Sequence, residues 1–113
     1  MIVANRTRQT TLADRAVAAR SFYQRLRGLM GKPSLPLGEG LLLFGDNSIH
    51  TFFMRFPIDV LYLDGERRVV RLQESMPPWE IGPLVRGCRC IVELPPGVIR
   101  DTRTSVGDSI TLE

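Results

Sequence analysis

Clusters of proline and glycine divide this chain of 113 residues into short segments, and they constrain its fold more than any other sequence feature. The densest clusters, at residues 31–40, 75–87 and 95–97, predict loops, because both residue types disfavour the interior of helices and strands. The longest purely apolar run, Leu41 to Phe44, is too short for a transmembrane helix. We therefore expect a single domain, residues 1–113, and a cytoplasmic location, since the N-terminus lacks the layout of a signal peptide.

Most segments between these clusters have the composition of β-strands. The expected strands are residues 1–5, 10–18, 41–44, 49–56, 58–63, 67–73, 88–94 and 109–112. Asp64-Gly65 predicts a tight hairpin, and residues 58–63 are apolar on both faces, which is typical of a central strand. One short helix is expected near residues 22–30, where apolar residues recur at helical spacing. The predicted fold class is mainly β: a small, barrel-like antiparallel or mixed sheet with that one helix.

Asp59 is the most unusual residue of the predicted central strand, because it should share a face with Leu61 and Leu63. A buried carboxylate must be hydrogen-bonded or paired, and Arg55 is a possible partner. Two interpretations stay open. Either Asp59 accepts backbone N–H bonds from a nearby turn and stabilises the fold, or it lies at the floor of a pocket near His50.

Two aromatic side chains join these residues as candidates for a ligand site. Trp79, the only tryptophan, lies in the proline-rich loop, where an indole suits either closing over a ligand or covering one end of the fold. His50 is the only histidine, and an imidazole suits acid–base chemistry or a structural role. The candidate ligand-site residues are His50, Phe53, Arg55, Asp59 and Trp79. No nucleophile motif or phosphate loop accompanies them, so no catalytic residue is assigned.

The cysteines and the charge distribution add weaker indications. Cys88 and Cys90 should point to one face of a strand, where they are too far apart for an easy disulfide. A zinc site could combine them with His50 and a carboxylate, but cysteines more commonly occur as buried free thiols. We therefore expect no metal and no cofactor.

Glu93, between Val92 and Leu94, is expected to be exposed. Residues 1–30 contain six arginines and one acid, which would attract an anionic partner unless these arginines are solvated or paired.

Four short motifs occur in order along nearly the whole chain. They are Arg27-Gly28-Leu29-Met30-Gly31, the run from His50 to Asp64, Val92-Glu93-Leu94-Pro95-Pro96-Gly97, and Val106-Gly107-Asp108. Together they resemble the domain-of-unknown-function family number 192, whose pattern often has tryptophan at the position of Phe53. The resemblance implies a compact, β-rich, barrel-like domain with a signature centred on His50 to Asp59, and it implies no reaction.

The function that we expect from these observations is the binding of a small ligand, or of a protein or peptide, in a pocket around the segment from His50 to Asp59. One alternative is an enzyme that uses His50 and Asp59 as an acid–base pair. Another is an RNA- or acidic-protein-binding factor that uses the arginine-rich N-terminal third. A protein that spans a membrane is not expected.

Overall fold

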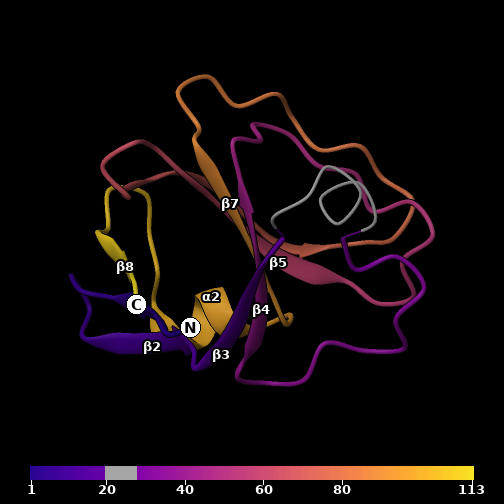
Figure 1. The fold of residues 1–113 in the computed structure, drawn as a ribbon, viewed down its shortest axis with the longest axis horizontal. Coiled ribbons are helices and arrows are strands. Elements are labelled where there is room, and N and C mark those ends of the chain that lie inside the picture. The colour runs from indigo at the N-terminus through magenta and orange to yellow at the C-terminus, as the bar shows by residue number, and fades with distance from the viewer. Residues whose placement is uncertain (20–27) are drawn as a thin grey trace.

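The strands of the protein form two sheets, as Figure 1 shows for residues 1–19 and 28–113, the part of the chain that the computed structural model describes. In the smaller sheet, β1 (Val3–Asn5) lies between β2 (Thr10–Ala13) and β8 (Ile110–Leu112). Both pairings are antiparallel. This sheet therefore joins the two ends of the chain.

The larger sheet forms the centre of the fold. Its strand order is β3 (Arg15–Ala19), β4 (Glu39–Phe44), β7 (Cys90–Leu94), β5 (Ile58–Leu63) and β6 (Val69–Met76). β3 pairs with β4 in parallel, and the other neighbours are antiparallel. A short helix, α2 (Val98–Thr102), follows β7. No helix in the described ranges has the length and apolar character needed to cross a membrane.

The mainly β class that the sequence predicts is confirmed, but the described strands form two open sheets instead of one barrel-like sheet. The reason lies in the C-terminal segment. Pro95-Pro96-Gly97 ends β7 and leads the chain into α2, after which β8 pairs with β1, and an isolated bridge between Ser109 and Arg68 lies beside the start of β6. The expected helix near residues 22–30 falls mainly on residues 20–27, which lie outside the described residues, and residues 28–31 form a turn.

The larger sheet separates two apolar clusters because its central strands are buried on both faces. Every residue of β5 and β7 is buried. Leu61 and Leu63 pack with residues of β1, β2, β8 and α2 on one side, while Val60 and Tyr62 pack on the other side beneath the loops. Figure 1 shows α2 and the smaller sheet on one side, and the magenta and orange loops on the opposite side. We call these the helix side and the loop side.

The segment 49–56 is not the strand that its alternating pattern predicts. Within it, His50 alone makes an isolated bridge, and Phe52 and Phe53 form a turn. Phe53 has a φ of 64°, in the left-handed region, which is incompatible with a regular strand. The apolar residues of this segment instead alternate between the loop-side core and the surface, with Met54 buried and Phe53 exposed.

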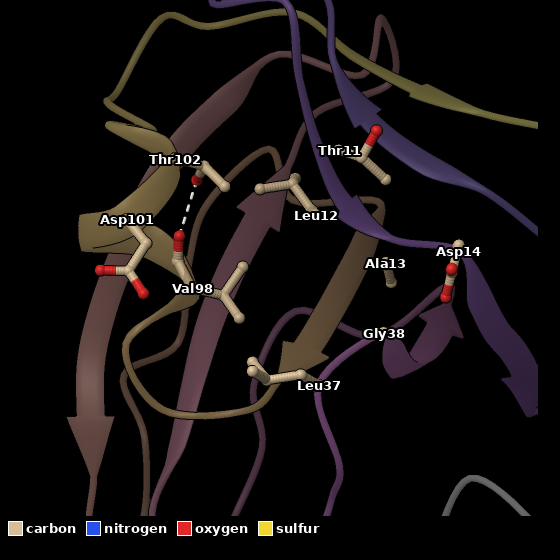
Figure 2. Close-up of a pocket in the computed structure, with 9 residues that line it drawn as sticks. All are labelled: Thr11, Leu12, Ala13, Asp14, Leu37, Gly38, Val98, Asp101 and Thr102. Carbon is tan, nitrogen blue, oxygen red and sulfur yellow. Dashed lines mark hydrogen bonds between the residues drawn. The ribbon is translucent and has the colours of Figure 1, made fainter.

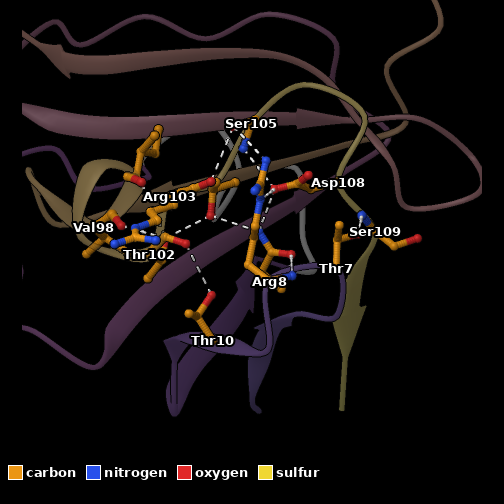
Figure 3. Close-up of polar contacts among 12 residues, drawn as sticks. Thr7, Arg8, Thr10, Val98, Thr102, Arg103, Ser105, Asp108 and Ser109 are labelled. Carbon is orange, nitrogen blue, oxygen red and sulfur yellow. Dashed lines mark hydrogen bonds and ion pairs between the residues drawn. The ribbon is translucent and has the colours of Figure 1, made fainter.

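A polar network fastens the segment after α2 to the N-terminal strands (Figure 3). The buried carboxylate of Asp108 accepts hydrogen bonds from Asn5 Nδ2 at 2.9 Å, from the Ser105 amide at 2.9 Å and from Arg8 Nε at 3.2 Å. Burial alone would raise the pKa of Asp108, but the hydrogen bonds from Asn5, Ser105 and Arg8 hold it below its ordinary value. Arg8, one of the N-terminal arginines, is thus paired with a buried carboxylate although its own side chain is 44% exposed.

Candidate functional site

Two loops cover the loop side of the larger sheet and run alongside each other. The first connects β4 to β5 and the second connects β6 to β7. His50 forms an antiparallel bridge with Ile81, and the Gly82 amide donates to the Ile49 carbonyl at 2.8 Å. Further along, the Val85 amide donates to Asn47 at 2.8 Å. Paired backbones of this kind give irregular loops a defined shape.

Thr51 holds the two loops together from a fully buried position. Its hydroxyl donates to the Pro77 carbonyl at 2.6 Å and accepts from the Glu80 amide at 2.9 Å. Its backbone amide donates to the Glu80 carbonyl at 2.8 Å, and its carbonyl accepts from the Trp79 amide at 2.9 Å. The sequence gives no indication of this role, because a threonine is common in strands and the segment has the pattern of a strand.

The loops bring together three of the residues that the sequence nominates: His50, Phe53 and Trp79. The His50 ring stacks on Phe52 with centroids 5.0 Å apart, and Phe52 lies 6.1 Å from Trp79. Phe53 contacts the same indole at a centroid distance of 4.7 Å. These four rings form what we call the aromatic cluster. His50 Nδ1 also accepts the Phe52 amide at 3.2 Å, which fixes the orientation of the imidazole.

Two members of the aromatic cluster combine high exposure with strained backbone. Phe53 is 58% exposed with a φ of 64°, and Trp79 is 59% exposed with a φ of 65°. Bulky residues rarely adopt the left-handed region, and such strain concentrates at functional sites. Ile81 and Leu84 of the same loop as Trp79 are 74% and 77% exposed, so this loop presents further apolar side chains to solvent.

Asp59 lies on the helix side of the sheet, away from the aromatic cluster. Its Oδ1 accepts the Ser75 amide at 2.9 Å, and its Oδ2 accepts the amides of Gly97 at 3.1 Å and Ile99 at 2.8 Å. Asp59 therefore connects the end of β6 to the start of α2, as the structural interpretation of this residue predicts. His50 belongs to the loop side, and Arg55 is exposed.

A buried carboxyl and a buried phenol lie on the loop side beneath the covering loops. Glu93 is 3% exposed and Tyr62 is fully buried, so the expectation that Glu93 is exposed is wrong. Burial and the nearby Asp46 raise the pKa of Glu93 to about 8, and burial raises the pKa of Tyr62 to about 12. Sequence alternation missed Glu93 because β7 is covered on both faces.

A surface pocket of about 300 Å³ lies elsewhere, between β2, the loop before β4 and α2. Figure 2 shows its lining residues: Thr11, Leu12, Ala13, Asp14, Leu37, Gly38, Val98, Asp101 and Thr102. The carboxylate of Asp14 pairs with Arg15, and that of Asp101 pairs with Arg100. The Thr102 hydroxyl donates to the Val98 carbonyl at 2.7 Å, so this hydroxyl and the two carboxylates of the pocket are already partnered.

The cysteines do not share a face. Cys88 packs in the loop-side core and Cys90 in the helix-side core, because Cys88 precedes the first residue of β7. Both thiols are free, and burial raises the pKa of each, to about 11 for Cys90. In the described ranges, no three side chains of histidine, cysteine, aspartate or glutamate gather as metal ligands would.

Two N-terminal arginines are engaged within the protein. Arg8 pairs with Asp108, and Arg15 bonds to Asp14 at 3.0 Å and to the Leu37 carbonyl at 2.9 Å. The arginines at positions 20, 25 and 27 lie outside the described residues.

Two solved structures share this fold. One, a protein of unknown function from Novosphingobium aromaticivorans, has a TM-score of 0.85 and 19% identity, and the match covers 98% of this chain and 82% of that one. The other, a putative transcription regulator from Sinorhizobium meliloti, has a TM-score of 0.78 and 19% identity, with 97% and 89% covered. At this identity the likeness concerns the fold alone.

Sequence comparisons give the family. The model of DUF192, described as "Uncharacterized ACR", matches residues 3–112. A UPF0127 protein of Thermococcus sibiricus is 35% identical over an alignment of 113 positions, and the match covers 96% of this chain and 73% of that protein. A UPF0127 protein of Pyrococcus horikoshii is 32% identical over an alignment of 116 positions, and the match covers 96% of each chain. The chain therefore belongs to the DUF192 family, whose curated relatives are named UPF0127 proteins.

Proposed function

We propose that this protein is a peptide-binding module whose aromatic cluster receives an apolar side chain of a partner polypeptide. The observation that carries this proposal is the pair Phe53 and Trp79. The two rings are in contact and both are more than half exposed. Each also occupies a backbone conformation that bulky residues rarely adopt.

The exposure of these rings supports a macromolecular partner. Together with Ile81 and Leu84, they present four large apolar side chains on paired loops. Exposed groups of large apolar side chains mark interaction sites, and tryptophan is enriched among the residues that dominate binding energy. The polar side chains at the edge, His50 and Arg55, would then give orientation to the bound segment.

The buried Thr51 supports the same proposal because it reduces the conformational entropy that the loops lose on binding. Its four hydrogen bonds hold the loops in one arrangement before a partner binds. Association is opposed by the ordering of loops and side chains, so a preformed surface binds more tightly than a mobile one. The strain at Phe53 and Trp79 is sustained by this framework.

The two alternative functions are less favoured. The carboxylate of Asp59 is already occupied by three backbone amides on the helix side, which leaves His50 without it as an acid–base partner. Arg8 and Arg15 are held by intramolecular bonds, which weakens the case for anion binding.

A cytoplasmic location is part of our proposal, and the two free cysteines are compatible with it.

A random peptide library displayed on phage and selected on the full chain tests this proposal. We expect the selected peptides to share an apolar or aromatic anchor. Trp79→Ala should weaken their binding by about tenfold or more, because a buried tryptophan contact contributes about 2 kcal/mol or more at interfaces. Isothermal titration calorimetry gives the dissociation constants.

A matched pair of leucine variants provides the control. Leu84 is 77% exposed on the second loop, and Leu37 is 72% exposed beside the pocket between β2 and α2. Leu84→Ala should reduce affinity, whereas Leu37→Ala should leave it unchanged. If the library yields no binder, or if Leu37→Ala and Trp79→Ala weaken binding equally, the aromatic cluster is not the binding surface.

A further inference from the structure

Two buried polar atoms lack a hydrogen-bond partner in the described part of the chain: Glu93 Oε2 and the Tyr62 hydroxyl. Buried polar groups in proteins are almost always hydrogen-bonded, and each exception needs an explanation. An unpartnered buried group destabilises the folded state by the loss of its hydration. A ligand that supplies the missing partner is one such explanation.

The strand register places both side chains on the loop side of the sheet. Val60 lies opposite Glu93, and Tyr62 lies opposite Ile91, on adjacent antiparallel strands. Glu93 and Tyr62 are therefore diagonal neighbours on one face, where long side chains reach one another across a Cβ separation of roughly 7 Å. The two side chains are also close enough to interact electrostatically, since the charge of Glu93 adds to burial in raising the pKa of Tyr62.

Gly82 of the second loop lies directly against the phenol. A Cβ atom added to Gly82 would fall 3.0 Å from the Tyr62 hydroxyl oxygen and 3.1 Å from the Ile49 carbonyl oxygen. Any larger residue would crowd the hydroxyl from above. Glycine at this position therefore allows the backbone of the covering loop to lie close to this unpartnered group.

Burial decides the protonation state of the pair. A carboxylate that is 3% exposed and has no paired cation among the described residues is costly to ionise. Among the described residues, the charged neighbour that acts on Glu93 is the acidic Asp46, which disfavours ionisation further. With a pKa of about 8, Glu93 is mostly protonated at pH 7, as is Tyr62. The loop side therefore offers two neutral O–H donors.

We propose that Glu93 and Tyr62 form the floor of a small-ligand site and donate hydrogen bonds to one acceptor oxygen, a carbonyl, of an uncharged ligand. A carbonyl oxygen accepts two hydrogen bonds and carries no charge that must be desolvated. Paired neutral donors of a carboxylic acid and a phenol are a known means of binding such an oxygen in an apolar environment. This site is separate from the peptide surface, and it does not depend on it.

Cyclohexanone and cyclohexylamine are the probes that test this proposal, because they share a shape and differ in the polar group. The wild-type chain, labelled for NMR, is titrated with each compound. We expect cyclohexanone to shift the signals of the Glu93 carboxyl and the Tyr62 ring. Tyr62→Phe and Glu93→Leu should each weaken its binding by about three- to tenfold, which corresponds to one lost hydrogen bond. Glu93→Gln keeps a donor and should retain binding, and Glu80→Gln is the exposed control.

The pKa of the Glu93 carboxyl in the wild-type chain gives a second readout that needs no variant. An acceptor oxygen binds the protonated acid and should raise this pKa, whereas an ammonium group binds the carboxylate and should lower it. A raised pKa with cyclohexanone supports the proposal. It is overturned if cyclohexanone shifts neither residue, if the variants bind it unchanged, or if cyclohexylamine binds more tightly and lowers the pKa.

Discussion

Replacement of Asp59 by alanine should destabilise the protein more than any exposed substitution. The carboxylate is fully buried and accepts three backbone hydrogen bonds, from Ser75, Gly97 and Ile99, at 2.8 to 3.1 Å. Its removal leaves three amides without their acceptor, and each unsatisfied buried amide destabilises by about 1–3 kcal/mol.

The environment of each amide sets the expected size of the effect. The bond to Ile99 is fully buried, whereas those to Ser75 and Gly97 are only partly buried, so water can replace part of the lost bonding there. We therefore expect Asp59→Ala to lower the free energy of unfolding by about 3–5 kcal/mol. Asp59→Asn keeps one acceptor oxygen and should lower it by about half as much.

Urea denaturation followed by circular dichroism at pH 7 measures these differences. The matched control is Asp101→Ala, because Asp101 is 69% exposed in its side chain and lies on α2 itself. The control should change the free energy of unfolding by less than about 0.5 kcal/mol. A loss below about 1 kcal/mol for Asp59→Ala would refute the argument that this carboxylate locks α2 to the sheet.

Three further predictions follow from buried groups. Thr51→Val should lower the free energy of unfolding by about 2 kcal/mol and shift the emission of Trp79, because the hydroxyl contacts both Pro77 and Glu80. Between pH 4.5 and about 8 the folded chain retains a proton on Glu93 that the unfolded chain releases. Stability should therefore fall as pH rises through this window, by on the order of 4 kcal/mol, and Glu93→Gln should abolish the fall. The buried thiols with raised pKa should react with Ellman's reagent no faster than the protein unfolds, and rapid labelling would contradict their burial.

The central strands could be located from the sequence because they are mostly apolar and a turn signal follows the first of them. The apolar run from Ile58 to Leu63 is buried on both faces, and the segment after Asp64-Gly65 returns as β6. The same reasoning placed Asp59 on the face of Leu61 and Leu63, where its hydrogen bonds to α2 are found. These inferences use only strand alternation, which holds wherever a strand is regular.

The loops could not be predicted because their shape depends on distant contacts. The alternating pattern of residues 49–56 is identical to that of a strand, but Thr51 bonds to a loop some thirty residues away and Phe53 takes a left-handed conformation. Glu93 was misplaced for a related reason, since a single acid in an apolar strand gives no indication that both faces are covered. Three of the four residues of the aromatic cluster, His50, Phe53 and Trp79, were nominated from the sequence, but Phe52 was not, and the way in which the four rings assemble is known only from the structure.

The most direct test of the proposed function is NMR chemical-shift mapping with a library-selected peptide. We predict that the largest shifts occur at His50, Phe53 and Trp79, because these residues form the exposed aromatic cluster. Shifts centred on Leu37 and Val98 would instead place the peptide in the pocket between β2 and α2, and would contradict the account.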